Sequence, residues 1–311
     1  MARYLGVDTS NYTTSVCVYE PETGRIWPAA RLLQVKSGEK GLRQSDALFQ
    51  HTVQLPRLME QLRPHMQDLR GVGVSYAPRR VEGSYMPCFL AGLSAAHAAA
   101  AALGVPCREF SHQEGHLMAV VSELDPSQQE QLLAAPFLAF HLSGGTTELL
   151  LVRRSAPGFQ VEVLGGTLDI SVGQLIDRAG VLLGLNFPCG RELDALAATS
   201  QWSGKVRVSL RDGWCNLSGF ENQCRQKLQK GEPAADVARW VLTVVAEHLM
   251  EMVAAAEQVH PGLPLVMMGG VASNSLLRQR FAGLPGRSVY FASGERSRDN
   301  AIGISVLASM E

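Results

Sequence analysis

The sequence has few cysteines and no excess of positive charge, the features that would indicate an oxidising compartment or binding to a polyanion. Its 311 residues include six Cys, none of them in a Cys-x-x-Cys pair. This excludes a dense disulfide framework and a thiolate zinc site, so we expect reduced thiols in a cytoplasm. The 28 Lys and Arg balance 29 Asp and Glu. Net charge alone therefore would not hold the chain on nucleic acid, and any such binding requires a local patch.

Long apolar runs are equally scarce. Only residues 89–107 approach the length of a membrane span, and Ala dominates that stretch. Ala contributes little to membrane insertion, and Gly104 and Pro106 end the run as they would end a buried helix. Asp8 stands where a signal peptide would need its apolar core. We therefore expect a cytoplasmic protein that does not contact a membrane.

The chain does have enough apolar residues for a large core. Hydrophobic residues make up 46% and charged residues 18%, which excludes a disordered or fibrous chain. The length fits two lobes of ordinary domain size.

One pattern occurs twice along the chain. Residues 4–18 and 138–152 each form an apolar strand, a turn of small polar residues and a returning strand, with paired threonines at 13–14 and 146–147. Strands alternate with helical patterns elsewhere, which indicates an α/β protein of two duplicated lobes. We predict lobes at 1–134 and 135–311, with the last helix, about 299–310, returning towards the N-terminal lobe. Further helices are expected at 45–66, 111–124, 172–185, 190–200 and 234–259.

The two polar turns are the first candidate for chemistry. The turn at 9–11, which includes Ser10, and the turn at 143–147 offer backbone N–H groups and hydroxyls that can hold phosphate oxygens. Either turn alone also fits an ordinary polar hairpin, but the matched pair favours a nucleotide site. In the segment 266–278 a strand ends in Gly269-Gly270 and is followed by a helix, where a purine or ribose can approach the backbone. The segment has no G-x-G-x-x-G, so a dinucleotide fold is a weak interpretation.

His112 and His116 are the second candidate. Four residues apart on a helix, their imidazoles lie on one face and can share a metal, although two solvated histidines would show the same spacing. Glu114 points away from that face, so this is not the H-E-x-x-H helix of zinc proteases. The remaining ligands should carry oxygen, and Asp299 is a candidate carboxylate.

These pieces together resemble a known family, the tRNA threonylcarbamoyladenosine transferases, formerly called O-sialoglycoprotein endopeptidases or glycoproteases. Six motifs in order carry the resemblance: Gly-Val-Asp-Thr-Ser at 6–10, His-Gln-Glu-Gly-His at 112–116, Ser-Gly-Gly at 143–145, Leu-Gly-Leu-Asn-Phe-Pro at 183–188, Met-Gly-Gly-Val-Ala-Ser-Asn at 268–274, and Asp-Asn at 299–300. It implies the actin/sugar-kinase/Hsp70-like fold with a central cleft. The implied partners are an adenine nucleotide, tRNA and the proteins of a tRNA-modification complex.

The resemblance also implies the site residues. One divalent metal ion per subunit, iron or zinc, would be held by His112, His116 and Asp299; His141 stands where some members have a ligating Tyr. The ligand would be an adenine nucleotide or acyl-adenylate, bound by Leu142, Ser143, Gly144, Gly145, Asp177, Gly190 and Asn274. The implied reaction passes a threonylcarbamoyl group from its adenylate to an adenosine amine of tRNA. No catalytic residue is assigned.

The substrate loops depart from the family pattern. Ala77–Ser84 replaces a Gly-Pro-Gly-Leu loop, Asn11–Thr14 a Cys-Asp-Glu-Thr turn, Gly173–Arg178 a Gly-Glu-Ala-Phe-Asp-Lys run, Phe187–Arg191 a Tyr-Pro-Gly-Gly-Pro turn, and Trp214–Phe220 a Phe-Ser-Phe-Ser-Gly-Leu-Lys stretch. Three hypotheses follow: a transferase acting on tRNA, a divergent paralogue that performs carbamoyl-type transfer to another acceptor, and a non-catalytic nucleotide-binding scaffold. No nucleophile–base pair supports protease chemistry. The basic residues 79–80, 153–154, 225, 227 and 230 are too scattered to predict an RNA-binding stripe.

Overall fold

The computed structural model describes residues 1–10, 12–35, 42–294 and 301–310. Two compact units divide the chain. The first consists of residues 1–134, 154–160 and 295–311, and the second of 135–153 and 161–294. Neither unit is one continuous stretch, because a hairpin tip and the C-terminal residues join the first.

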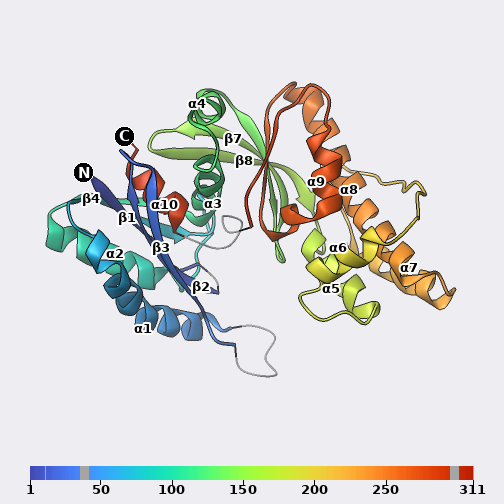
Figure 1. The fold of residues 1–311 in the computed structure, drawn as a ribbon, viewed down its shortest axis with the longest axis horizontal. Helices are drawn as coiled ribbons and strands as arrows, with labels where there is room; N and C mark the ends of the chain where they lie inside the picture. Colours follow the sequence, from blue (N-terminus) through green and yellow to red (C-terminus); the bar gives the residue numbers. More distant parts are fainter. Residues whose placement is uncertain (11, 36–41, 295–300, 311) are drawn as a thin grey trace. The chain divides into compact units, whose positions relative to one another are not determined.

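The first unit is built on a five-stranded sheet in the order β3-β2-β1-β4-β5 (Figure 1). The first three strands form an antiparallel meander, whereas β4 and β5 run parallel to β1 and therefore need crossover helices. The strands are β1 (Arg3–Asp8), β2 (Thr13–Glu20), β3 (Arg25–Leu32), β4 (Leu69–Ala77) and β5 (Cys107–Ser111). The helices are α1 (Gln44–Leu62), the 3-10 turn η1 (Arg63–His65), α2 (Phe89–Leu103), α3 (His112–Val121), α4 (Pro126–Ala134) and α10 (Ile302–Ala308).

Helices cover both faces of this sheet, because successive residues of its central strands face opposite sides and both sides can pack against a helix. Leu5 and Val7 pack with residues of α1 and α2 in one apolar cluster. The intervening residues of the central strands include Gly6 and Gly73, and α10 lies against them. A Cβ atom at Gly73 would lie 2.7 Å from the carbonyl oxygen of Ile304, so the glycines let the helix approach the sheet closely.

The second unit repeats this plan. Its sheet has the order β11-β10-β6-β7-β8-β9, in which β6 and β7 form an antiparallel hairpin and β10 and β11 run parallel to β6. The hairpin β6–β7 thus corresponds to β1–β2, and β10–β11 to β4–β5, which confirms the predicted duplicated α/β fold. The strands are β6 (Phe137–Leu142), β7 (Thr147–Ser155), β8 (Gly158–Thr167), β9 (Trp214–Cys215), β10 (Leu265–Met268) and β11 (Val289–Phe291).

A single long helix organises the core of the second unit. The helix α8 buries residues along most of its 26-residue length, and α5, α6, α7 and α9 pack against it (Figure 1). The helices are α5 (Val172–Leu182), α6 (Gly190–Ala198), α7 (Ser218–Gln229), α8 (Ala234–Val259) and α9 (Ser275–Ala282), with the 3-10 turn η2 (Gly270–Ser273) after β10.

Several elements differ from the sequence prediction. The helices α4 and α7 and the strand β8 were not predicted, since their residues are polar or interrupted by glycine. The helix α3 ends at Val121, three residues early. The Ala-rich segment is the helix α2, which ends at Gly104 in the left-handed conformation. Within the described residues, no helix is both long enough and apolar enough to span a bilayer.

The contact between α3 and α10 generates a stability prediction. A Cβ atom at Gly303 would overlap the carbonyl oxygen of Gly115 on α3. We expect Gly303→Ala to lower the free energy of unfolding by about 1–3 kcal/mol, because packed backbones must separate. Chemical denaturation measures this. Gly219→Ala on α7 is the control, since a Cβ atom there would meet no other atom within 4 Å, and it should stay within about 1 kcal/mol of wild type. Equal midpoints for both variants and wild type would contradict the prediction.

Candidate functional site

The histidine pair lies at the start of α3, and a capping box sets where that helix begins. The Ser111 hydroxyl accepts from the backbone N–H of Glu114 at 3.3 Å, and the Glu114 carboxylate accepts from the backbone N–H of Ser111 at 2.7 Å. His112 is thus the first helical residue and His116 lies one turn further on. Their ring centroids are 4.3 Å apart, close enough for both imidazoles to reach one ion.

Asp8 orients the first of the two imidazoles. This residue ends β1, is fully buried, and its Oδ2 lies 2.7 Å from Nδ1 of His112. Its Oδ1 accepts from the Ser75 hydroxyl and from the Ser10 N–H, both at 2.8 Å. A carboxylate on the far nitrogen of a histidine fixes the ring and makes it a stronger ligand, as in many metal sites.

Ser10 leaves an unused polar group beside this carboxylate. Its side chain is 2% exposed, and its hydroxyl has no hydrogen-bond partner among the described residues. Buried hydroxyls are costly to leave unpaired, so this one is suited to a bound ligand or water.

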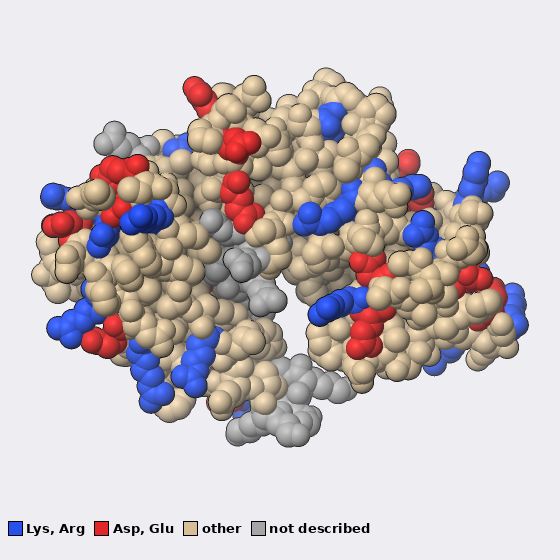
Figure 2. Space-filling view, viewed as in Figure 1, with Lys and Arg blue, Asp and Glu red and all other residues tan. Residues whose placement is uncertain are grey.

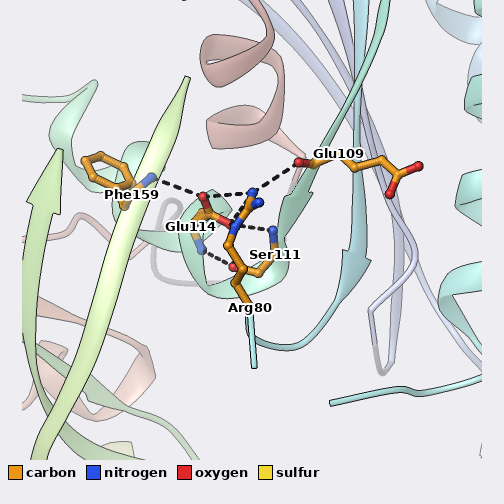
Figure 3. A network of polar contacts seen from close by, with 5 residues as sticks. All are labelled: Arg80, Glu109, Ser111, Glu114 and Phe159. Carbon is orange, nitrogen blue, oxygen red and sulfur yellow. Dashed lines mark hydrogen bonds and ion pairs between the residues drawn. The ribbon is translucent and has the colours of Figure 1, made fainter. Parts of the chain in front are cut away.

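Glu114 fastens α3 to two other segments (Figure 3). Besides its own cap, the buried carboxylate accepts from the Ser111 hydroxyl at 2.8 Å and from the Phe159 N–H of the hairpin tip at 3.1 Å. The Arg80 guanidinium donates to it at 3.3 Å and to the Glu109 carbonyl at 3.2 Å. Arg80 belongs to the loop that departs from the family pattern, so this loop is anchored on the helix that carries the histidines.

The structure does not test the other two predicted metal ligands. Asp299 lies outside the described residues, and His141 is on β6 in the second unit, in register with Met268 and Glu148. Across the part of the chain that is described, no three His, Cys, Asp or Glu residues form a metal-binding group. The two histidines and the carboxylate behind His112 nevertheless suit a divalent ion, and their role as ligands stays a prediction.

A cavity of about 380 Å³ in the second unit gathers the predicted ligand-binding residues. Its size is that of a small-molecule site. Four of those predicted residues line it, namely Gly144, Asp177, Gly190 and Asn274. The other lining residues are Gly173, Ile176, Pro188, Arg191, Asp194, Gly270, Val271 and Ser273. Residues more than a hundred positions apart thus meet at one place.

The turn between β6 and β7 forms one wall. The Ser143 hydroxyl accepts from the N–H groups of Gly145 and Thr146, at 3.3 and 3.0 Å, which closes the turn on itself. A Cβ atom at Gly173 would lie 2.5 Å from the Ser143 carbonyl oxygen, so glycine there lets α5 press against the turn. A Cβ atom at Gly144 would meet no other atom within 4 Å, and this residue therefore leaves open space on the cavity side.

The start of α6 forms the second wall. Asp177 accepts the Cys189 N–H at 2.8 Å through Oδ1, and no described residue bonds its Oδ2. The helix has no side-chain N-cap, so N–H groups of its first turn are available beside Gly190 and Arg191. Burial, with help from Asp177, raises the pKa of the Cys189 thiol, so that this buried side chain stays protonated at neutral pH.

Asn274 and Asp194 shape the third wall. The Asn274 side-chain oxygen caps α9 by accepting from the Leu277 N–H at 3.1 Å, which leaves its amide nitrogen as a donor. Asp194 accepts from both the N–H and the hydroxyl of Ser275 at 2.8 Å. Both carboxylate oxygens are engaged, and its role is to hold α9 against α6.

The remaining predicted residues lie outside this cavity lining. Leu142 is buried in the core, Ser143 and Gly145 belong to the turn, and Ser10 is in the first unit. Sequence reasoning missed Arg191 and Asp194. Arg191, directly after Gly190, was noted only as a departure from the family turn, although a cation beside a glycine is a usable signal for phosphate.

Comparisons with solved structures agree on the fold. HypF of T. kodakarensis aligns with a TM-score of 0.64 at 14% identity, over 98% of this chain and 46% of that one. A hydroxyisocaproyl-CoA dehydratase activator from Clostridium difficile, with bound ADPNP, aligns with a TM-score of 0.55 at 14% identity, over 98% and 94%. A ROK hexokinase from Thermus thermophilus gives 0.52 at 15%, over 98% and 97%. All share the predicted actin/sugar-kinase/Hsp70-like fold.

Sequence comparisons assign the family. The tRNA N6-adenosine threonylcarbamoyltransferases of Streptococcus pneumoniae strains CGSP14 and JJA are each 34% identical over 225 residues. The match covers 70% of this chain and 62% of each relative, less than two thirds of their length. The model of the tRNA N6-adenosine threonylcarbamoyltransferase family matches residues 41–306. The chain therefore belongs to the tRNA N6-adenosine threonylcarbamoyltransferase family.

Proposed function

We propose that the cavity lined by Gly144, Asp177, Gly190 and Asn274 binds an acyl-adenylate, and that the protein transfers its carbamoyl-type acyl group to an adenosine amine of tRNA. The observation that carries this proposal is the convergence of four predicted ligand-binding residues on one cavity in a member of this family. Two proteins of the same fold, the dehydratase activator and a HypF, were solved with nucleotides bound, which supports a nucleotide by analogy of fold.

Each wall of the cavity suits one part of an adenylate. The uncapped start of α6 and the Arg191 guanidinium favour the phosphate, since both present N–H donors and positive charge. The Asp177 oxygen that no described residue bonds suits a ribose hydroxyl. Gly144 and Gly270 have open space around them, where the flat adenine or the acyl carbonyl can approach the backbone.

The reaction is a substitution at the acyl carbon. The adenosine amine attacks the carbonyl carbon of the mixed anhydride, a carbon–nitrogen bond forms, and the bond to the phosphate oxygen breaks. AMP leaves with the electron pair of that bond, and the amine proton passes to solvent or to the phosphate. Arg191 and the α6 N–H groups would stabilise the charge that collects on the leaving phosphate.

His112 and His116 would hold the divalent ion, with Asp8 fixing the His112 ring so that Nε2 coordinates. Asp299 and His141 are the proposed further ligands. When bound, iron or zinc supplies a Lewis acid that stabilises developing negative charge on a carbonyl or phosphate oxygen.

A specific observation favours a changed substrate as the second candidate. Arg191 lines the cavity where the family pattern has proline. A guanidinium there adds a positive charge and five donors next to the adenylate. This residue would suit an acyl group more acidic or more polar than threonylcarbamoyl, a changed substrate that stands beside the divergent-paralogue hypothesis of carbamoyl-type transfer to another acceptor. A scaffold that binds nucleotide without catalysis is the third.

Nucleotide binding is tested with two substitutions in the cavity. Asp177→Asn keeps an oxygen for the Cys189 N–H but removes the charged acceptor, and Arg191→Gln removes the cation. We expect each to weaken AMP affinity about tenfold by calorimetry, the usual loss for one charge-assisted hydrogen bond. Arg178→Gln is the matched control, because this exposed arginine pairs with Glu221 outside the cavity and should bind AMP as wild type does. Wild-type affinity in both cavity variants would refute the site.

Metal binding is tested by elemental analysis of the purified protein. His112→Ala should abolish stoichiometric iron or zinc while the circular dichroism spectrum stays native. His97→Ala is the control, since this exposed histidine bonds Glu109 and should leave the metal content unchanged. His141→Ala should weaken metal retention, and His141→Tyr should restore much of it. Wild-type metal content in His112→Ala would show that the ion, if present, binds elsewhere.

The acyl group and acceptor are tested together in a transfer assay. Threonylcarbamoyl-adenylate and unmodified tRNA are incubated with the metal-loaded protein, and nucleosides are analysed by mass spectrometry. Formation of threonylcarbamoyladenosine, reduced in Asp177→Asn, is the expected result. Tight binding of the adenylate without tRNA modification would favour the divergent-paralogue hypothesis. Binding of AMP without any acyl transfer to tRNA or water would support the scaffold.

A further inference from the structure

A second polar cavity lies in the second unit. Part of its lining comes from a loop that contains no helix and is followed by a strand of only two residues. Residues 201–213 form an irregular loop between α6 and β9, drawn in yellow in Figure 1. Side chains alternate along its centre: Lys205, Arg207 and Ser209 are exposed, whereas Val206 and Leu210 pack against the core. The loop therefore presents a polar, cationic edge on an apolar base. Basic side chains project where this loop runs (Figure 2).

A tight turn fixes the end of the loop. Arg211 and Trp214 exchange backbone hydrogen bonds at 2.9 Å, and the two residues between them, Asp212 and Gly213, have positive φ of 52° and 85°. This is the geometry of a type I′ turn, which Asp-Gly favours. Trp214 then joins β9, which pairs with β8. The turn thus holds Arg211 and Trp214 opposite one another at the start of β9.

These residues surround a cavity of about 260 Å³. The lining combines cations, aromatic rings and hydrogen-bonding groups, and it shares no residue with the adenylate cavity. The lining residues are Arg207, Val208, Ser209, Leu210, Arg211, Trp214, Cys215, Asn216, Phe220 and His248.

His248 contributes a buried hydrogen-bond acceptor to the lining. Its side chain is 2% exposed, and its Nδ1 lies 2.8 Å from the Val244 carbonyl oxygen, to which it must donate. Burial lowers the pKa of His248, so the ring is neutral at pH 7. Nε2 of the neutral ring then carries a lone pair that can accept from a ligand. The ring packs against Phe220 with centroids 5.2 Å apart, which sets its orientation.

Two of the residues that line the cavity carry a positive charge. Neither Arg207 nor Arg211 has an ion-pair partner in the described ranges, and none of the lining residues is acidic. Other basic side chains of this unit do have carboxylate partners, including Arg178 with Glu221, Arg280 with Glu247 and Arg287 with Glu257. Both arginines are exposed and line the same cavity, where one anion can accept hydrogen bonds from both guanidiniums. The cavity is therefore suited to an anionic ligand.

We infer that this cavity binds a nucleotide, with Arg207 and Arg211 on its phosphate and the base between Trp214, Asn216 and His248. Guanidiniums form bidentate hydrogen bonds with phosphate oxygens, and an indole ring offers a stacking surface for any base. The Asn216 amide and the His248 lone pair can pair with the polar edge of a base or with a ribose hydroxyl. The nucleotide is either free or part of a single-stranded RNA.

An acidic peptide fits the same charges less well. Carboxylates would satisfy Arg207 and Arg211, but they have no use for the Trp214 ring or for the His248 acceptor, which needs a donor from the ligand. A nucleotide carries a phosphate, a flat ring and hydrogen-bond donors in one molecule, and so it uses all of these groups.

The test uses the full chain and two probes, AMP and a short fluorescein-labelled single-stranded RNA of mixed sequence. The variant Arg207→Gln/Arg211→Gln should bind RNA at least tenfold more weakly than wild type near 0.1 M salt. The slope of log K against log salt should become shallower by about 0.7, because the two guanidiniums share one phosphate contact on a single strand. The variant Arg225→Gln/Lys230→Gln is the control, because it removes two exposed charges of the same unit outside the cavity.

Trp214→Phe gives a second, independent measurement. It should abolish the change in tryptophan fluorescence that ligand binding causes, while leaving an aromatic ring in the cavity. Loss of both AMP and RNA binding in the arginine variant would show that a free nucleotide suffices, and loss of RNA binding alone would place the nucleotide in a strand. Unchanged RNA binding by that variant, or displacement of RNA by a polyglutamate peptide, would overturn the inference. To separate AMP binding at the two cavities, the AMP titrations are done in the Asp177→Asn background, in which the adenylate cavity binds AMP about tenfold more weakly, and the arginine variant is compared with that background.

This inference does not rest on the proposed transferase activity. Arg207→Gln/Arg211→Gln should leave acyl-adenylate binding intact, whereas Asp177→Asn should leave RNA binding intact. The two variants can therefore refute the ligand proposed for one cavity without refuting the ligand proposed for the other.

Discussion

The buried carboxylate of Glu114 is the interaction on which the candidate metal site depends. A carboxylate that is 1% exposed would be costly without partners, and here backbone N–H groups, a hydroxyl and a guanidinium all donate to it. These bonds decide where α3 begins, and they hold the loop at Arg80 and the hairpin tip at Phe159 on the helix. The positions of His112 and His116 follow from that starting point. Because the partners come from three separate segments, the site is completed only when the unit has folded.

The two units use one plan for different purposes. In the first, Gly6, Gly73 and Gly303 let α10 pack tightly against the sheet and α3, which supports a histidine pair at the end of the strands. In the second, the corresponding end of the sheet opens into a cavity walled by the turn after β6 and the starts of α6 and α9. Ligand sites beyond the carboxyl ends of strands are common in α/β folds. Duplication thus supplied two similar frames, and the turn residues made them chemically different.

Much of the fold could be predicted because it is local. The repeated hairpins, the histidine spacing and α8 were each visible in a single window of residues, and the family and fold predicted from them are confirmed. The helices α4 and α7 and the strand β8 were not predicted. The 218–229 segment is mostly polar, with Cys224 its one buried residue, and its periodicity is too weak to indicate a helix without its tertiary partners. The metal ligands and the ligand-binding residues stay predictions.

The sequence by itself determined the family, the duplicated α/β architecture and which residue types were available for a metal and an adenylate. Only the tertiary structure decided how they are used. It showed that Asp194 holds α9 with both of its oxygens and that Asp177 has one oxygen to which no described residue bonds. It also brought Arg207, Trp214 and His248 to one cavity, although the first and the last are 41 positions apart in the sequence. The physical reason is that hydrogen-bond partners and burial arise between segments distant in the chain, where no sequence window can register them.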